Sequence, residues 1–286
     1  MSETEIRKLK IQSSPLKIYN ILIITIICYL IIQSWISTGM DFSSIINGWS
    51  DLILFIKGNP NVEGSGFFPP SFYNIKTYFW AMVQTVEMAI VALFFSFILA
   101  FPLSLITSRN ILEIIIPGQK IYHIIIKKFL YFTGIFIANV FRSVNEIVWA
   151  LIFVSAVGLG PMAGILALGI HTTGVLSKLL SEGNEAIDPA PIKALVHNGA
   201  SFLKVLVYGI LPQTMPHIIS MTLYRFESDV RSATVLGFVG AGGIGFYLFD
   251  KIRGFENAEV TTILITIIVT VWILDNISAY IRKKFI

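Results

Sequence analysis

The sequence predicts an all-α polytopic membrane protein with about six transmembrane helices. Composition is the first indication: 55% of the 286 residues are hydrophobic, only 13% are charged, and mean hydropathy is +0.77. These values lie far from the composition of a soluble globular domain. Apolar runs of about 20 residues, the length of helix that crosses a bilayer, recur along the chain. Basic residues gather in alternate connecting segments, as the positive-inside rule describes.

Six apolar runs are long enough to span a membrane. They cover residues 18–36, 80–106, 129–157, 162–180, 205–224 and 260–280. The first run follows a basic flank, which is also typical of a signal peptide and consists of Arg7, Lys8, Lys10 and Lys17. The run is longer than the ~7–15 residues of a signal-peptide core and lacks a small-x-small cleavage site. We therefore expect it to be retained as the first transmembrane helix.

The orientation follows from the basic residues between the runs. With the N-terminus inside, the inner segments hold fourteen Lys and Arg residues and the outer segments hold five. This asymmetry predicts that both termini are cytoplasmic. We expect residues 1–79 to hold the cytoplasmic N-terminus, an accessory first helix and an outer loop. Residues 80–286 then form a transmembrane core with a long inner loop at about 181–204.

Composition and motifs exclude several classes of function. The net charge of +4 is small and scattered, which argues against a nucleic-acid partner. Cys28 is the only cysteine, so neither a disulfide nor a Cys-based metal site forms within one chain. The chain has no Gly-x4-Gly-Lys-Ser/Thr phosphate loop and no His-Glu-x-x-His motif, and its histidines lie in different predicted segments. We expect no cofactor or metal in this chain, and we interpret His171 as a polar contact between helices.

Ionisable residues at membrane depth are costly and usually face a bundle interior or an aqueous path. Three pairs of opposite charge have the i,i+4 spacing that places both members on one helical face. They are Arg142 with Glu146, Arg225 with Asp229, and Glu227 with Arg231. The pairs either neutralise one another and hold helices together, or line a gate or path for a polar solute. In the second case the arginines favour an anion.

The inner loop contains a predicted short helix. In Asp188-Pro189-Ala190-Pro191 the aspartate is suited to cap a helix and a proline to occupy its first turn. Asn198-Gly199 follows, and glycine after the last helical residue is typical of a helix end. We therefore expect a cytoplasmic helix from about residue 190 to residue 197.

Glycines cluster before the last span, at Gly240, Gly242, Gly243 and Gly245. Gly-x-Gly-x-x-Gly is also the dinucleotide-binding pattern, but that site needs a soluble βαβ unit and an acidic residue ~20 positions further on. The predicted orientation places these glycines outside, away from cytoplasmic nucleotide. We expect a tight, non-helical chain path here, which serves either as an outer gate element or for close helix packing.

Two stretches resemble the permease subunits of type I ABC importers, and most closely the phosphonate permeases. The first is the family's cytoplasmic loop motif, Glu-Ala-Ala followed by Gly and by Ile-x-Leu-Pro, which is matched at Ala194, Gly199, Leu211 and Pro212. Lys193 stands at the motif's Glu position and Gly209 at its Ile position. Residues 142–161 are similar to the phosphonate subgroup, with Asn145 where a proline is usual. The resemblance covers about residues 80–285.

The resemblance implies a type I ABC importer permease core that works as two copies in the lipid of a bacterial inner membrane. The inner loop then forms a coupling helix on a separate ABC ATPase, which binds ATP and Mg. The coupling residues are Asp188, Lys193, Ala194, Gly199, Leu211 and Pro212. A solute-binding protein outside delivers phosphonate or a related phosphorus oxyanion, which crosses by alternating access past a gate formed by the charged pairs and the glycines. The chain itself is then not an enzyme.

Two alternatives stay open from the residues alone. An intramembrane enzyme acting on phosphate esters would use Glu146, His171 or Asp229 as acid and base, and would turn over substrate without a partner. It also needs a converging nucleophile and base, for which the sequence has no motif. A secondary transporter would instead move solute on an ion gradient without ATP.

Overall fold

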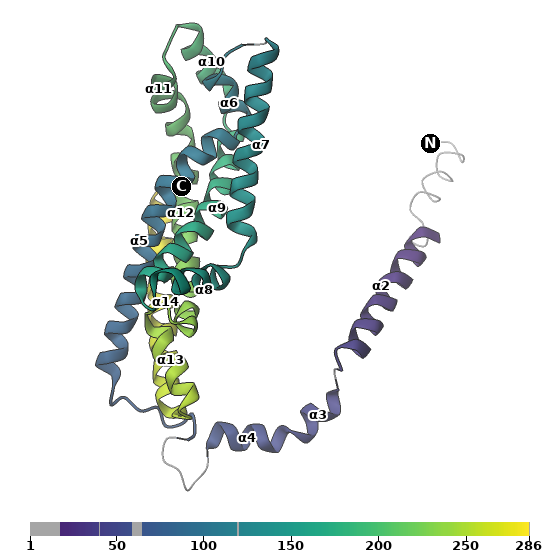
Figure 1. Ribbon diagram of the computed structural model, residues 1–286, viewed down its shortest axis with the longest axis vertical. Coiled ribbons are helices and arrows are strands. Elements are labelled where there is room, and N and C mark those ends of the chain that lie inside the picture. The colour runs from purple at the N-terminus through teal and green to yellow at the C-terminus, as the bar shows by residue number, and fades with distance from the viewer. Residues whose placement is uncertain (1–17, 40, 59–64, 119, 286) are drawn as a thin grey trace, which may run out of the picture. The chain divides into compact units, whose positions relative to one another are not determined.

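The computed structural model describes residues 18–39, 41–58, 65–118 and 120–285 (Figure 1). The basic flank of Arg7, Lys8, Lys10 and Lys17 lies outside these described residues. Every regular element in the described ranges is a helix, as predicted. Six of these helical stretches are long and apolar enough to cross a membrane, which confirms the expected number. The chain divides into two compact units at Phe55 and Ile56. The predicted division at residue 79 stays a prediction.

The first unit contains α2 (Ile18–Ser37), α3 (Phe42–Asn47) and most of α4 (Trp49–Lys57). Apolar side chains surround α2, and none of those described is buried. The Thr25 hydroxyl is satisfied within the helix, because Oγ1 donates to the Ile21 carbonyl at 2.9 Å. A helix of this length that is apolar on all sides is suited to lipid.

The second unit is a bundle around α9. Its long helices are α5 (Ile75–Thr107), α7 (Ile121–Ser143), α9 (Pro161–Glu185), α12 (Leu211–Leu236) and α14 (Asn257–Phe285). Shorter helices connect them: α6 (Arg109–Ile115), α8 (Glu146–Val157), α10 (Pro189–His197), α11 (Phe202–Val205), the π-helix η1 (Leu206–Ile210), the 3-10 helix η2 (Gly237–Val239) and α13 (Ile244–Arg253). Helix α9 contacts α5, α7, α8 and α12, which are labelled near it in Figure 1.

Small residues allow α9 to occupy this central place. At Gly174 an added Cβ would lie 2.6 Å from the Arg142 backbone nitrogen, so α7 approaches the α9 backbone directly. Ser96 Oγ on α5 donates to the Gly169 carbonyl on α9 at 2.9 Å. Close backbone approach and hydrogen bonds between helices are the interactions that associate helices in lipid, where no hydrophobic effect drives them together.

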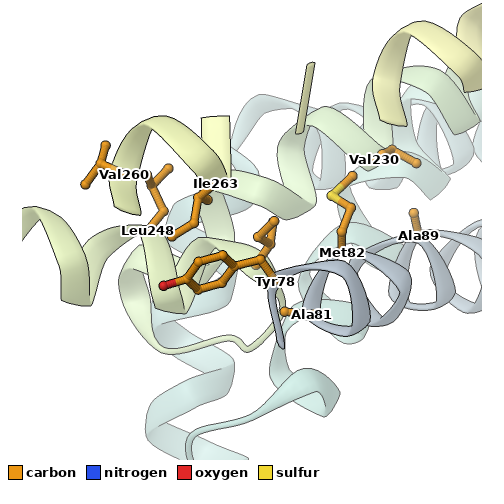
Figure 2. Close-up of a cluster of buried hydrophobic side chains, with 9 residues drawn as sticks. Tyr78, Ala81, Met82, Ala89, Val230, Leu248, Val260 and Ile263 are labelled. Carbon is orange, nitrogen blue, oxygen red and sulfur yellow. The ribbon is translucent and has the colours of Figure 1, made fainter. Parts of the chain in front are cut away.

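An apolar cluster extends from the α13 end of the bundle toward its interior (Figure 2). It joins α5, α12, α13 and α14 through Tyr78, Ala81, Met82, Ala89, Val230, Ile244, Leu248, Val260 and Ile263. The segment before α5 is fixed to α14 through the Ser71 backbone: its N–H donates to the Ala258 carbonyl at 3.1 Å, and its carbonyl accepts from Thr262 Oγ1 at 2.6 Å. This end therefore has its irregular segment hydrogen-bonded to the helices.

The predicted third span, 129–157, is wrong as a single helix. Helix α7 starts at Ile121 and ends at Ser143, and α8 begins at Glu146. The break occurs because Asn145 caps the new helix, accepting a hydrogen bond from the Ile147 N–H at 2.9 Å. Helix α8 has 12 residues, which is too short to cross a bilayer. The apolar run 129–157 therefore contains most of one membrane-spanning helix, α7, and a shorter second helix, α8.

Candidate functional site

A buried ion pair lies in the middle of the bundle. Arg225 and Asp229 are one turn apart on α12, and Arg225 Nη2 lies 2.7 Å from Asp229 Oδ1. The Asp229 side chain is fully buried and Arg225 is 8% exposed. This predicted pair is confirmed.

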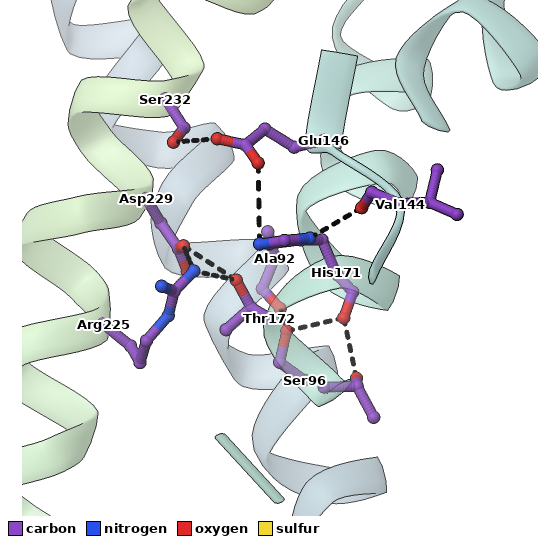
Figure 3. A network of polar contacts seen from close by, with 11 residues as sticks. Ala92, Ser96, Val144, Glu146, His171, Thr172, Arg225, Asp229 and Ser232 are labelled. Atoms are coloured by element: carbon purple, nitrogen blue, oxygen red, sulfur yellow. Dashed lines mark hydrogen bonds and ion pairs between the residues drawn. The ribbon is translucent and has the colours of Figure 1, made fainter. Parts of the chain in front are cut away.

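Thr172 connects this pair to α9. Its hydroxyl donates to Asp229 Oδ1 at 2.7 Å and accepts from Arg225 Nη2 at 2.9 Å. The three side chains form a closed triangle of charge-assisted hydrogen bonds between α9 and α12 (Figure 3). Sequence spacing gives no signal for this contact, because Thr172 lies 57 residues before Asp229.

The triangle leaves two polar atoms without a hydrogen-bond partner. Within the described part of the chain these are Arg225 Nε and Asp229 Oδ2, both buried. Isolated charges in a low-dielectric interior are costly, and truncating one partner of a buried pair typically costs about 3–5 kcal/mol. Each residue of the pair therefore depends on the other for its stability in the bundle interior. Arg225 Nε and Asp229 Oδ2 could each form one more hydrogen bond.

A second polar chain runs beside the triangle. Ser232 Oγ on α12 donates to Glu146 Oε1 at 2.6 Å, and Glu146 Oε2 lies 3.5 Å from His171 Nε2. The other ring nitrogen of His171 is 3.0 Å from the Val144 carbonyl at the α7–α8 break. Figure 3 shows this chain joining α12, α8 and α9. His171 is therefore a helix-packing contact, as the sequence suggested.

The order of these groups does not suit nucleophilic catalysis. In a Ser-His-acid arrangement the histidine lies between the hydroxyl and the carboxylate. Here Glu146 separates Ser232 from His171, and the remaining His171 nitrogen faces a backbone carbonyl. Among the residues that the structure describes, no three His, Cys, Asp or Glu side chains gather to hold a metal ion.

The predicted pair of Arg142 and Glu146 is wrong. The helix ends between them, so their i,i+4 spacing does not place them on one face. Arg142 instead donates to Asn139 Oδ1 through Nε at 3.0 Å and Nη2 at 2.9 Å, while Glu146 bonds Ser232. Arg142 is exposed near the end of α7.

The predicted pair of Glu227 and Arg231 is also wrong. Each residue binds a partner on α14: Arg282 Nη2 lies 2.7 Å from Glu227 Oε1, and Arg231 Nη1 lies 3.1 Å from Asp275 Oδ1. An i,i+4 pair contributes only about 0.2–0.5 kcal/mol, so contacts with a neighbouring helix readily replace it. These two ion pairs hold α12 and α14 together.

Arg142 borders a hollow of about 300 Å³ between α5, α7 and α9. Its polar lining includes Tyr131 and Asn139 on α7 and Lys178, Ser181, Glu182 and Glu185 on α9. Lys178 Nζ lies 3.6 Å from Glu182 Oε1, and both side chains are at least half exposed. A charged side chain at such a place is tolerated where water or a partner subunit covers it.

The inner loop folds as predicted. Helix α10 spans Pro189–His197, and Asp188 Oδ1 accepts a hydrogen bond from the Ala190 N–H at 2.9 Å. Gly199 follows the helix with a φ of +75°, a conformation that favours glycine. Lys193 and Ala194 are exposed on α10. Both are therefore accessible to a partner.

Gln213 ties α10 to α12, and sequence reasoning missed it. Its Oε1 accepts from the Asp188 N–H at 3.0 Å, and its Nε2 donates to the Gly209 carbonyl at 2.8 Å. Gln213 follows Leu211 and Pro212, with which α12 begins. The start of α10 is thus hydrogen-bonded directly to the first turn of α12.

Packing explains why glycine stands at position 209. A Cβ there would lie 3.1 Å from Leu195 Cδ1 and 3.4 Å from Ile192 Cγ1, both on α10. Ile192 is the buried residue of α10 and belongs to an apolar cluster with Leu105, Ile111, Val205 and Ile210. The absence of a side chain at Gly209 lets α10 lie close to η1.

The glycines before α13 form a tight turn. Gly240, Gly242 and Gly243 have φ values of +82°, +80° and +73°, and the Ile244 N–H donates to Thr85 Oγ1 on α5 at 2.8 Å. An added Cβ at Gly243 would lie 2.6 Å from that same hydroxyl oxygen. At Gly245 it would lie 2.0 Å from the Thr234 carbonyl oxygen. The expected non-helical path and close packing are confirmed, and a gate role stays a prediction.

A second ionic cluster lies at the opposite end of the bundle from α10. Lys251 Nζ on α13 is 2.7 Å from Glu256 Oε2 and 3.0 Å from Glu259 Oε2. Glu259 also accepts hydrogen bonds from Asn74, at 2.9 Å, and from the Tyr78 hydroxyl. The hydrogen bond to Glu256 is the main cause that raises the pKa of Lys251 above its usual range, so this ammonium stays charged. The cluster ties α5, α13 and α14 together.

These features are those of an integral membrane protein: apolar helices long enough to span, an ion pair buried between them, and a capped helix between two spans at one end. Residues 124–285 match the family described as binding-protein-dependent transport system inner membrane component. The chain belongs to this family, and the resemblance to type I ABC importer permeases is confirmed. It is an inner-membrane, multi-pass transport subunit.

Two relatives support this membership, and a solved structure has a similar fold. A phosphite transport system permease of Stutzerimonas stutzeri is 33% identical over 83% of this chain and 82% of its own length. A protein of Escherichia coli K12, named for a cryptic phosphonate transport system permease, is 57% identical over 43% of this chain and its whole length. The fold is similar to that of an inward-facing methionine ABC transporter, with a TM-score of 0.64 and 22% identity over 76% of this chain and 99% of that one.

Proposed function

We propose that this chain is the transmembrane subunit of an ATP-driven importer for a phosphorus oxyanion, namely phosphonate or phosphite. The substrate class is supported by relatives that are named as phosphonate and phosphite transport permeases. The chain works with a second permease copy, a solute-binding protein outside, and an ABC ATPase inside that binds ATP and Mg. We infer from the basic residues that both termini lie in the cytoplasm.

The observation that supports coupling is the path from α10 to the buried ion pair. Gln213 fastens the capped start of α10 to the first turn of α12. The same helix carries Arg225 and Asp229, which bind Thr172 on α9. A displacement of α10 by the ATPase therefore moves α12 and acts on its contacts with α9. Packed helices with two alternative arrangements convert such shifts into domain motion.

In this mechanism the exposed face of α10, with Lys193 and Ala194, is the docking surface. Asp188 and Gly199 fix the two ends of the helix, and Leu211 and Pro212 begin the helix that receives the motion. The candidate gate consists of the ionic contacts of α12 and the glycine turn that packs on Thr85. Arginine favours an oxyanion because its guanidinium donates several hydrogen bonds in a planar array.

Reconstitution tests the function. The chain is placed in proteoliposomes with its partner ABC ATPase and solute-binding protein, and uptake of labelled phosphite and methylphosphonate is measured with sulfate as control. We expect uptake of a phosphorus oxyanion that requires ATP. Uptake without ATP would indicate a secondary transporter, and ATP-dependent uptake of neither compound would refute the proposed substrate class.

A variant tests the coupling path. Gln213→Leu keeps the side-chain size and removes the hydrogen bonds to Asp188 and Gly209. We expect ATP hydrolysis to continue while uptake per ATP falls at least severalfold. The matched control is Asn276→Leu, which removes an exposed amide that donates to the Trp272 carbonyl of its own helix at 2.7 Å. Equal coupling in both variants would show that Gln213 does not transmit the motion.

A further inference from the structure

We propose that the hollow between α6 and α7 binds the head group of an anionic phospholipid from the cytoplasmic leaflet. The hollow has a volume of about 330 Å³. It is lined by Arg109, Leu112 and Glu113 of α6 and by Lys127, Lys128, Tyr131 and Phe132 of α7. Three of its side chains are cationic and one is anionic, so the site is positive overall. Nothing in the transport mechanism above uses these residues.

Hydrogen bonds position two of the three cationic side chains. Arg109 Nε donates to the Tyr131 hydroxyl at 2.9 Å, and its guanidinium carbon lies 5.1 Å from the centre of the Tyr131 ring. The Arg109 N–H donates to Glu185 Oε1 on α9 at 2.9 Å, which fixes the start of α6. Lys127 Nζ donates to the Gly118 carbonyl at 3.2 Å and keeps two further protons for a ligand. Lys128 is exposed.

The surroundings favour a lipid over a free anion. One face of α7 presents Ile125 just before the two lysines and Phe129, Phe132 and Phe136 after them, each more than 60% exposed. These positions follow the i, i+4, i+7, i+11 spacing of a single helical stripe. Phe132 belongs both to this stripe and to the wall of the hollow. The apolar stripe therefore continues directly into the basic site, which suits acyl chains joined to a phosphate head group.

The leaflet is assigned through the proposed function. Asn110 and Glu113 of α6 also line the hollow beneath α10, so α6 lies at the α10 end of the bundle. If α10 faces the ATPase, this end is cytoplasmic. Basic pockets beside transmembrane helices on that side are suited to anionic head groups, and each Lys or Arg near the surface strengthens binding about fivefold.

Lipid binding is measured on the full chain, purified in detergent, by titrating cardiolipin and phosphatidylcholine in native mass spectrometry. We expect cardiolipin to be retained preferentially, and Lys127→Gln/Lys128→Gln to weaken its binding roughly 30-fold. The control, Lys283→Gln/Lys284→Gln, removes the same charge from two exposed adjacent lysines at the end of α14. It is expected to bind cardiolipin nearly as well as the unmodified chain.

Each contrary result is informative. No preference for cardiolipin, or an equal loss in both double variants, would overturn the proposal and leave only diffuse electrostatic attraction. Displacement by millimolar inorganic phosphate would assign the site to a free oxyanion. A lower dimer fraction in Lys127→Gln/Lys128→Gln with unchanged lipid binding would assign it to a second copy. None of these readouts requires transport, so failure of the proposed function and failure of this site are distinguished.

Discussion

Replacing Asp229 with Leu should destabilise the bundle far more than removing a surface charge. The change leaves Arg225, which is 8% exposed, without its carboxylate, and it removes the hydrogen bond from Thr172. An uncompensated buried charge of this kind costs about 3–5 kcal/mol. For a chain of this size that corresponds to a decrease in Tm of roughly 6–20 °C.

The assay is thermal unfolding in detergent, followed by the fluorescence of the five tryptophans. The control is Glu182→Gln, which breaks an ion pair whose side chains are 50% and 60% exposed and should cost about 0.2–1 kcal/mol. The double variant Arg225→Met/Asp229→Leu removes both charges and should recover most of the lost stability. A single variant as stable as the control, or a double variant no more stable than the single one, would refute the reasoning.

Three further changes test packing and capping by the same unfolding assay. Gly243→Ala should destabilise the protein more than Gly158→Ala. Both glycines have a positive φ, but only at Gly243 would the added methyl group crowd a neighbouring atom. Equal losses of stability would indicate backbone strain alone. Asn145→Pro should lower the free energy of unfolding by about 1 kcal/mol, because the φ of −62° suits proline but the side-chain cap of α8 is lost. Unfolding of the α8 region in this variant would contradict the prediction. Gly209→Ile should cost about 1–3 kcal/mol by overpacking against Leu195, and a neutral result would show that α10 can move aside.

Sequence reasoning was reliable where structure is local. Helix α10 follows from a capping aspartate, a proline and a glycine within a dozen residues, and each acts on its own neighbours. Arg225 and Asp229 pair because both lie inside one continuous helix. The number of spans was likewise predictable, since it depends only on apolar length.

Contacts between distant segments account for two residues that sequence reasoning missed and for one of its two wrong pairs. Thr172 and Gln213 find their partners through helix packing, for which one sequence contains no periodic signal. Glu227 prefers Arg282 on a neighbouring helix to the residue one turn away. The predicted pairing of Arg142 with Glu146 was wrong for a local reason that the sequence contains. Asn145 stands directly before Glu146, and asparagine is a favoured residue at the start of a helix.

The lysine at position 193 has a consequence for a cell that contains several importers. It is exposed on α10, where the family motif has a glutamate, so the charge that this helix offers is reversed. An ATPase whose groove attracts glutamate would repel it, and an ATPase with an acidic groove would repel the more common loop. We therefore expect this permease to bind its own ATPase specifically. Neither subunit should assemble readily with the subunits of other importers in the same cell.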